Sequence, residues 1–134
     1  MFNFKKALIL LLCTVMLIAA ALPAFAVTGY EVKDVNKPAI GVRARCTSHL
    51  TTEYAEGALR LSYLPAYSSN YLPEEDYSCH IQTSLSYGAL VLDFPYLGCS
   101  GMQYTQTISH GGYTCTAATF NYYVNGSFTY GKTF

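Results

Sequence analysis

The chain has 134 residues, and its eight Lys and Arg side chains balance eight Asp and Glu side chains, so its formal net charge is zero. This balance argues against nucleic acid or an anionic membrane surface as a partner, because both select a basic surface. The length fits one domain after a leader. Thirteen tyrosines, together with abundant Thr and Ser, favour an all-β fold, since these residues suit pleated strands.

Residues 1–26 have the features of a secretory signal peptide. Two lysines near the start precede an almost unbroken apolar run over 7–21, and Ala24 and Ala26 place small side chains at the positions that a signal peptidase recognises. An uncleaved membrane anchor is the alternative, because the run is nearly long enough to span a bilayer. Pro23 and its small neighbours favour cleavage. We therefore expect a secreted, extracellular domain over 27–134, without stable membrane insertion once the leader is removed.

Alternation of apolar and polar residues begins early in this domain. Residues 30–35 alternate weakly before Pro38, which predicts either an edge strand or a disordered tail. Residues 40–50 alternate clearly, and residues 58–64 return as a second strand. Residues 65–75 contain two prolines, Ser, Asn and acidic side chains, and they form the longest predicted loop.

The clearest strand pattern lies in residues 76–95. One parity is mostly apolar and consists of Tyr77, Cys79, Ile81, Thr83, Leu85 and Tyr87, whereas the other parity is polar. This pattern predicts a strand with one buried face. A two-residue turn at Tyr87 and Gly88 would place Leu85 opposite Leu90 and would begin a hairpin.

The C-terminal third contains two further turn signals. Residues 102–110 alternate and precede Gly111–Gly112, which predicts a tight hairpin. The apolar parity changes near Ala118, which indicates a β-bulge or a passage from one sheet to another. Asn125–Gly126 is the strongest hairpin signal, and residues 127–134 close the fold. The chain is thus predicted to form an antiparallel sandwich or small barrel of seven to eight strands.

Four cysteines remain in the predicted mature domain: Cys46, Cys79, Cys99 and Cys115. An even number in an exported chain predicts two disulfides, and sequence alone allows three pairings. The predicted hairpin favours a Cys79–Cys99 bond, which leaves Cys46 and Cys115 to join the two sheets across the core. A metal site is disfavoured, because no Cys-x-x-Cys or His-x-x-x-His spacing occurs.

No set of residues predicts catalysis. His49 and His80 lie on the polar parity of their strands, and His110 lies at a turn, so all three are predicted to be solvated. Asp93 is interpreted as an exposed strand carboxylate rather than a general acid or base. The acidic residues 74–76 lack the spacing of a calcium loop. We therefore expect no enzyme activity, no cofactor and no metal.

Tyrosine is the enrichment with functional content. Tyr is a rigid, amphipathic residue that is common at binding surfaces, and the long loop contains Tyr67 and Tyr71. These two residues are the candidate ligand-binding residues, since loops often carry function. The alternative is that the tyrosines serve strand propensity alone.

These observations predict a small secreted bacterial binding or surface-interaction protein without catalytic activity. Its expected partner is a cell-wall or surface carbohydrate or a protein. An exported bacteriocin-like toxin or effector is the alternative, and growth inhibition of neighbouring cells would distinguish the two. The sequence does not indicate an oligomeric state, although an exposed terminal strand would allow a second copy to pair.

Overall fold

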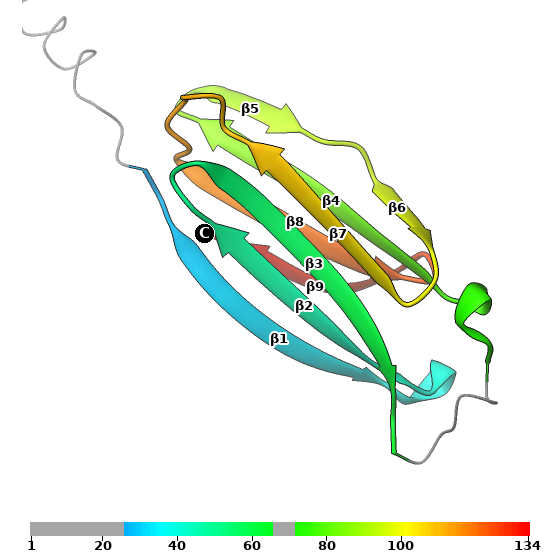
Figure 1. Cartoon of the computed structure of the whole chain (residues 1–134). Coiled ribbons are helices and arrows are strands. Elements are labelled where there is room, and N and C mark those ends of the chain that lie inside the picture. The colour runs from blue at the N-terminus through cyan, green and yellow to red at the C-terminus, as the bar shows by residue number, and fades with distance from the viewer. Residues whose placement is uncertain (1–25, 66–71) are drawn as a thin grey trace, which may run out of the picture.

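The computed structural model describes residues 26–65 and 72–134, which form nine strands in two antiparallel sheets (Figure 1). The strands are β1 (Gly29–Lys37), β2 (Val42–Leu50), β3 (Tyr54–Tyr63), β4 (Ser78–Tyr87), β5 (Leu90–Asp93), β6 (Leu97–Ser100), β7 (Gln103–Ser109), β8 (Ala117–Val124) and β9 (Ser127–Thr133). Two short 3-10 helices, η1 (Pro38–Ile40) and η2 (Glu74–Asp76), lie between strands. The all-β, antiparallel fold class is confirmed, with a sandwich-like arrangement rather than a barrel and with nine strands in the described residues rather than the predicted seven to eight.

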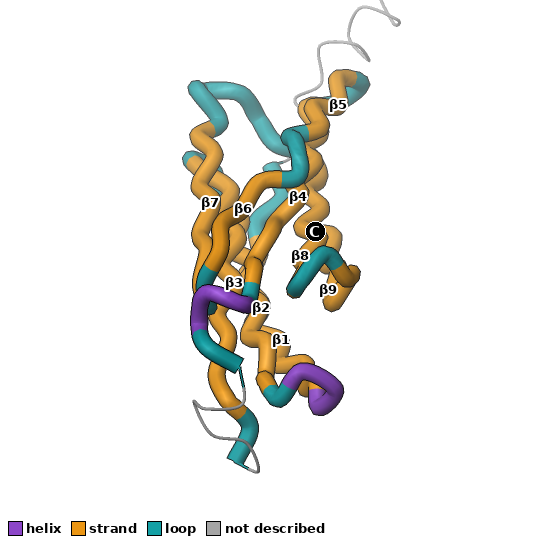
Figure 2. The backbone as a smooth tube through the Cα atoms, turned by 90° about the vertical axis from the view of Figure 1, so that its right-hand side faces the viewer, coloured by secondary structure: helices purple, strands orange, loops and turns teal. Residues whose placement is uncertain are grey.

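The two sheets are separate layers (Figure 2). The four-stranded sheet has the order β1-β2-β3-β7, and the five-stranded sheet has the order β5-β4-β8-β9, with β6 also paired to β4. Strands β5 and β6 lie one after the other along the same edge of β4. From β6 the chain passes directly into β7, so it changes sheets at that edge.

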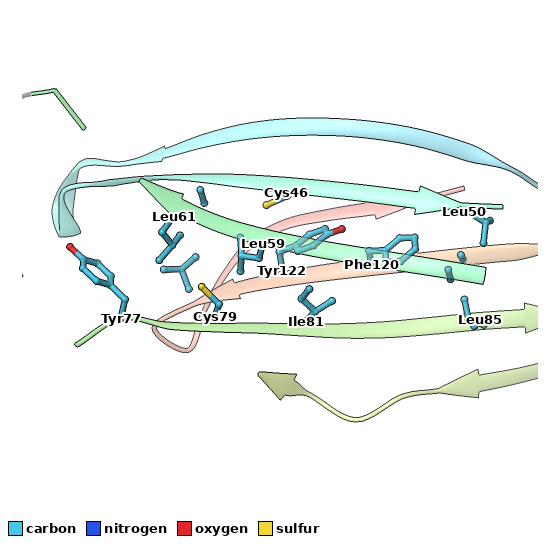
Figure 3. Close-up of a cluster of buried hydrophobic side chains, with 14 of the residues drawn as sticks. Cys46, Leu50, Leu59, Leu61, Tyr77, Cys79, Ile81, Leu85, Phe120 and Tyr122 are labelled. Atoms are coloured by element: carbon cyan, nitrogen blue, oxygen red, sulfur yellow. The ribbon is translucent and has the colours of Figure 1, made fainter. Parts of the chain in front are cut away.

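The buried residues follow the predicted alternation. Even-numbered residues of β2, from Val42 to Leu50, are buried, and so are the odd-numbered residues of β4 from Cys79 to Leu85. Figure 3 shows side chains of both sheets meeting in one core. The largest fully buried side chains are Tyr77, Tyr122, Phe120, Leu50, Leu59, Ile81 and Leu85. Burial of these apolar side chains is the main favourable contribution to folding.

The first strand is ordered and lies at the edge of the four-stranded sheet. Its register with β2 runs without interruption from Gly29 opposite Leu50 to Lys37 opposite Val42. The structure therefore decides between the edge strand and the disordered tail that the sequence left open. Across the gap between the sheets, Glu31 accepts a hydrogen bond from the Tyr130 hydroxyl of β9. This hydrogen bond joins the two sheets at the edge formed by β1 and β9.

The predicted register of the central hairpin was wrong. The turn consists of Gly88 and Ala89, and it places Leu85 opposite Leu92 rather than Leu90. Gly88 has a φ of 66°, a backbone conformation that favours glycine. Moving a two-residue turn by one position changes each cross-strand partner by two residues, so the inward face stays the same. The alternation thus fixes the buried face without fixing the turn.

The predicted hairpin at Gly111–Gly112 was also wrong. Both glycines have positive φ values, 58° and 87°, but the flanking strands lie in different sheets. Strand β7 pairs with β3, with Ile108 opposite Ala55, whereas β8 pairs with β4. Residues 110–116 therefore carry the chain between sheets, which accounts for the change of parity near Ala118. A pair of glycines indicates a turn but not which strands the turn connects.

The Asn125–Gly126 hairpin is confirmed. Asn125 and Gly126 have φ values of 51° and 76°, and Val124 lies opposite Ser127. Positive φ at both turn residues is typical of a type I′ turn. The predicted leader lies outside the described residues, apart from Ala26. Within 26–65 and 72–134, no helix has the length and apolar character that crossing a membrane requires.

Candidate functional site

The two candidate ligand-binding residues, Tyr67 and Tyr71, lie outside the described residues. Their assignment stays a prediction. The described residues present two other surfaces with binding features. One is a group of aromatic side chains on the outer face of the five-stranded sheet, and the other is an apolar cavity at its edge.

The aromatic group arises from the register of four strands. On the outer face, Gly98 of β6 lies opposite His80 of β4, and His80 lies opposite Tyr123 of β8. Tyr123 in turn lies opposite Phe128 of β9. Side chains at directly opposed positions on one face of a sheet are neighbours. Residues far apart in the sequence are therefore brought into one line across the sheet.

Ring contacts run through this line without a break. Tyr96, from the connection between β5 and β6, stacks on His80 with centroids 4.3 Å apart and an interplanar angle of 2°. Tyr96 also meets Tyr123 edge to face at 4.9 Å, and Tyr123 meets Phe128 at 5.7 Å. We call His80, Tyr96, Tyr123 and Phe128 the aromatic row. Tyr96 is 42% exposed and Phe128 is 59% exposed, so the row presents ring surface to solvent.

Gly98 permits this arrangement because it has no side chain. A Cβ atom at this position would lie 1.9 Å from the carbonyl oxygen of Cys79 and 2.7 Å from the Cα atom of His80. Such distances are far below van der Waals contact, and the Cδ2 atom of the His80 ring would also lie only 2.7 Å away. The glycine therefore allows β6 to lie close to β4 and leaves the His80 ring free to stack on Tyr96.

The His80 ring contributes its flat face rather than its polar atoms. Its Nδ1 atom is buried and has no hydrogen-bond partner within the described part of the chain. A buried nitrogen without a partner has a desolvation cost. The sequence prediction that His80 is a solvated side chain therefore needs correction, because Tyr96 covers the ring.

Polar amides lie beside the aromatic row on the same face. Gln82 of β4 lies opposite Asn121 of β8, two residues along each strand from the His80–Tyr123 pair. Both side chains are half-buried. Each amide group offers one acceptor oxygen and a donor NH₂ group. The outer face thus combines exposed aromatic rings with hydrogen-bonding amides, and Asp93 of β5 adds a carboxylate beside Ser84 on the same face.

The second surface is a cavity of about 500 Å³ at the edge where β5 and β7 lie. Its lining is mainly apolar and consists of Tyr87, Leu90, Leu92, Phe94, Ile108, Ser109, His110, Gly111 and Tyr113. Volumes of this size are typical of small-ligand pockets. The side chains come from both sheets, so the cavity lies between the layers at their open edge.

His110 is buried beside this cavity, contrary to the prediction that it is solvated. Only 3% of its surface is exposed. Its Nδ1 atom lies 3.1 Å from the Tyr87 hydroxyl, and its Nε2 atom lies 3.1 Å from the carbonyl oxygen of Thr51. Burial raises the pKa of the Tyr87 hydroxyl. Both ring nitrogens are therefore occupied in holding the turn that follows β7.

The other candidate polar residues have structural partners. His49 packs edge-on between the rings of Tyr30 and Tyr54, with centroids 5.2 Å and 5.5 Å away. Asp93 accepts a hydrogen bond of 2.6 Å from the Ser84 hydroxyl and is exposed. Among residues 26–65 and 72–134, no cluster of three or more His, Cys, Asp or Glu side chains could hold a metal ion.

The four cysteines are free thiols in this structure, so neither predicted disulfide is formed. Cys79 and Cys99 are nevertheless direct cross-strand partners in β4 and β6. Burial raises the pKa of the Cys79 thiol to about 12, and the neighbouring Cys99 adds to this effect. Opposed residues in an antiparallel pair have Cα atoms about 4.5 to 5.5 Å apart, which suits a disulfide.

The other predicted pair lies at two different levels of the sandwich. The carbonyl oxygen of Cys115 accepts a hydrogen bond from Val27, just before β1. Cys46 lies opposite Lys33, much further along the same strand. At about 3.3 Å per residue this separates them by roughly 20 Å, and a disulfide needs Cα atoms within about 7 Å. The arrangement does not fit the predicted Cys46–Cys115 bond.

No protein-family model, curated protein or solved structure matches the chain. Fold alone does not imply function, because one fold serves many unrelated activities. The chain's own surfaces therefore carry the functional evidence, and the aromatic row is the surface on which four rings from β4, β8, β9 and the β5–β6 connection meet.

Proposed function

We propose that this chain is a small secreted bacterial binding protein without catalytic activity, and that the aromatic row is its binding surface. The observation that carries the proposal is the unbroken series of ring contacts from His80 to Phe128. Aromatic side chains lose little conformational entropy on binding and offer a large contact area. In the aromatic row the rings already pack against one another, and this lowers the entropy that they lose on binding further.

A cell-wall or surface carbohydrate is the partner that this surface suits best. A sugar ring has an apolar face of C–H groups and a rim of hydroxyl groups. The exposed rings of Tyr96 and Phe128 offer contact to the first, and the amides of Gln82 and Asn121 offer hydrogen bonds to the second.

We further propose that the exported protein forms a Cys79–Cys99 disulfide. The register supports this bond, since the two residues lie directly opposite each other. Its formation removes two protons and two electrons, which a thiol–disulfide oxidant of the export compartment accepts. The bond would hold β6 against β4 directly beside Gly98 and His80, and so would fix the stacked part of the aromatic row. Peptide mapping without reduction would identify it by a linked pair of fragments.

A co-sedimentation assay tests the proposed function. The oxidised protein is mixed separately with bacterial cells, with insoluble cell-wall polysaccharide and with an unrelated insoluble protein. Pelleting with the polysaccharide and with cells, but not with the protein control, is the expected result. If nothing pellets and the purified protein kills cells in a viability assay, the alternative of an exported toxin replaces the binding proposal.

A further inference from the structure

Strand β5 presents an apolar edge to solvent. Leu90 is 58% exposed, Val91 is 53% exposed and Leu92 is 41% exposed. Among the described strands, β5 pairs with β4 alone. An unpaired apolar edge strand is a template for pairing with another chain.

Two other edge strands, β1 and β7, carry features that block such pairing. Strand β1 contains Lys33 and Lys37. Its Glu31 also bonds to Tyr130 and Lys132 of β9 in the other sheet. Strand β7 has the sequence QYTQTIS, whose side chains are mostly polar. Charged and polar side chains disfavour pairing of edges. Strand β5 has no Lys, Arg or Pro, and its one charged residue, Asp93, lies at its end.

The hydrogen bonds of β5 fix which backbone groups point outward. Phe94 N–H donates to the carbonyl oxygen of Thr83 at 2.8 Å. Because hydrogen-bonded and non-hydrogen-bonded positions alternate in an antiparallel pair, Leu90 and Leu92 also direct their backbone groups toward β4. Val91 and Asp93 therefore direct theirs away from the sheet.

We propose that β5 pairs antiparallel with β5 of a second copy of this chain. Outward-directed residues must face each other in such a pair, which allows Val91 to lie opposite Val91 of the second copy. Leu90 of each copy then lies opposite Leu92 of the other copy, so apolar side chains meet at the three central positions of the pair. The two Asp93 carboxylates lie at opposite ends, each opposite Ala89. A parallel pair in the same register would instead place the two carboxylates together, which costs energy.

The apolar cavity at this edge supports the same occupant. Leu90 and Leu92 line the cavity of about 500 Å³, and they are the residues whose counterparts approach in the pair. The second copy would therefore bring two leucines to the mouth of the cavity and cover apolar surface of both chains. The contact is isologous, because the same patch serves both copies.

One consequence rests on the proposed function. The two-fold axis of an antiparallel strand pair is perpendicular to the sheet, so the outer faces of both five-stranded sheets point to the same side. A dimer would therefore present two aromatic rows to one surface. Two linked sites on one polymer bind with higher avidity than one site.

Analytical ultracentrifugation of the oxidised protein over a range of concentrations tests the pairing. We expect a reversible monomer–dimer equilibrium for the wild type. Val91→Lys places a charge at the centre of the contact and should raise the dimer dissociation constant at least ~10-fold. Val32→Lys is the matched control, because Val32 is an exposed valine of edge strand β1, and this variant should dimerise as the wild type does.

Two outcomes would overturn the proposal. One is a wild type that stays monomeric at all concentrations. If this monomer binds an extended apolar peptide of a different sequence, the β5 edge is a site for another protein. The other is equal weakening by the two lysine variants while circular dichroism shows both to be folded. The ultracentrifuge contains no polysaccharide, so failure of the dimer is distinguishable from failure of carbohydrate binding.

Discussion

The hydroxyl group of Tyr122 lies 2.7 Å from the hydroxyl group of Ser48 in the buried core and joins the two sheets. Tyr122 also donates a hydrogen bond of 2.8 Å to the carbonyl oxygen of Thr47. Its single proton is used there, so Ser48 is the donor to Tyr122. Burial raises the pKa of the Tyr122 hydroxyl above its usual value. Both side chains are buried, so removal of one hydroxyl group takes a hydrogen-bond partner from the other.

We expect Tyr122→Phe to destabilise the fold by about 1 to 3 kcal/mol, the cost of an unsatisfied buried polar group. Urea denaturation monitored by circular dichroism measures the change in the free energy of unfolding. Tyr123→Phe is the matched control, because the adjacent Tyr123 lies on the outer face and should tolerate the loss of its hydroxyl. Equal midpoints for the two variants would contradict the role of the Tyr122–Ser48 bond.

His80→Phe and His110→Phe should have opposite effects on stability. Phenylalanine preserves a flat ring against Tyr96 and removes the buried Nδ1 atom of His80 that lacks a partner, so the first variant should be neutral or more stable. His110 bonds through both ring nitrogens, so its replacement should lower stability by about 1 to 3 kcal/mol. Thermal unfolding of both variants under one condition makes the comparison. A larger loss for His80→Phe would refute this assignment.

The contacts of Glu31 with Tyr130 and Lys132 should make the stability of the fold depend on pH. The hydroxyl of Tyr130 and the ammonium of Lys132 hold the pKa of the Glu31 carboxyl below its usual value. A carboxyl with a lowered pKa in the folded state stabilises the fold above its unfolded pKa of about 4.3, and this contribution is lost as the pH falls through the folded value. Glu31→Gln should therefore lower the melting temperature at pH 7, and the difference from the wild type should be smaller at pH 3. A gap of the same size at both pH values would argue against an ionic contribution from Glu31.

Thiol reactivity should separate the buried from the exposed cysteines. Burial raises the pKa of Cys46 and of Cys79 to about 12, so at pH 8 only about one such thiol in 10⁴ is ionised. Cys99 is exposed. In the reduced, folded protein iodoacetamide should therefore modify Cys99 well before Cys46, because the thiolate is the reacting form. Mass spectrometry of timed samples follows each site, and simultaneous modification of Cys46 and Cys99 would disprove the expected order.

The sequence predicted the buried faces well because one physical cause produces them. In β2 and β4 a strict period of two is imposed by a single apolar core, and each inward residue from Val42 to Leu50 and from Cys79 to Leu85 is buried as expected. The turn at Asn125 was predictable for an equally local reason, since it needs two residues with positive φ. Local patterns of this kind can be read without knowing the partner strand.

The rest depended on pairings between distant segments. The sequence could not show that β7 pairs with β3, because Gly111–Gly112 suits a hairpin and a sheet crossing equally. It also missed the aromatic row, whose members come from three strands and one connection and are aligned only by the register. His80 and Tyr123 are visible in the sequence as large rings on polar parities, but residues 95–101 suggest a turn rather than the strand that contains Gly98, and no local pattern joins these residues. The sequence alone therefore points to the loop residues Tyr67 and Tyr71 instead.

Equilibrium binding to insoluble cell-wall polysaccharide tests the central claim most directly. The dissociation constant is measured by depletion for the wild type, for a Tyr96→Ala, Phe128→Ala double variant, and for Tyr30→Ala. Tyr30 is the control, because it is an exposed tyrosine, 65% accessible, on the other sheet. We predict that the double variant binds at least ~10-fold more weakly, as truncation of central aromatic contacts usually does, and that Tyr30→Ala binds like the wild type. Unchanged binding by a folded double variant would contradict the assignment of the aromatic row.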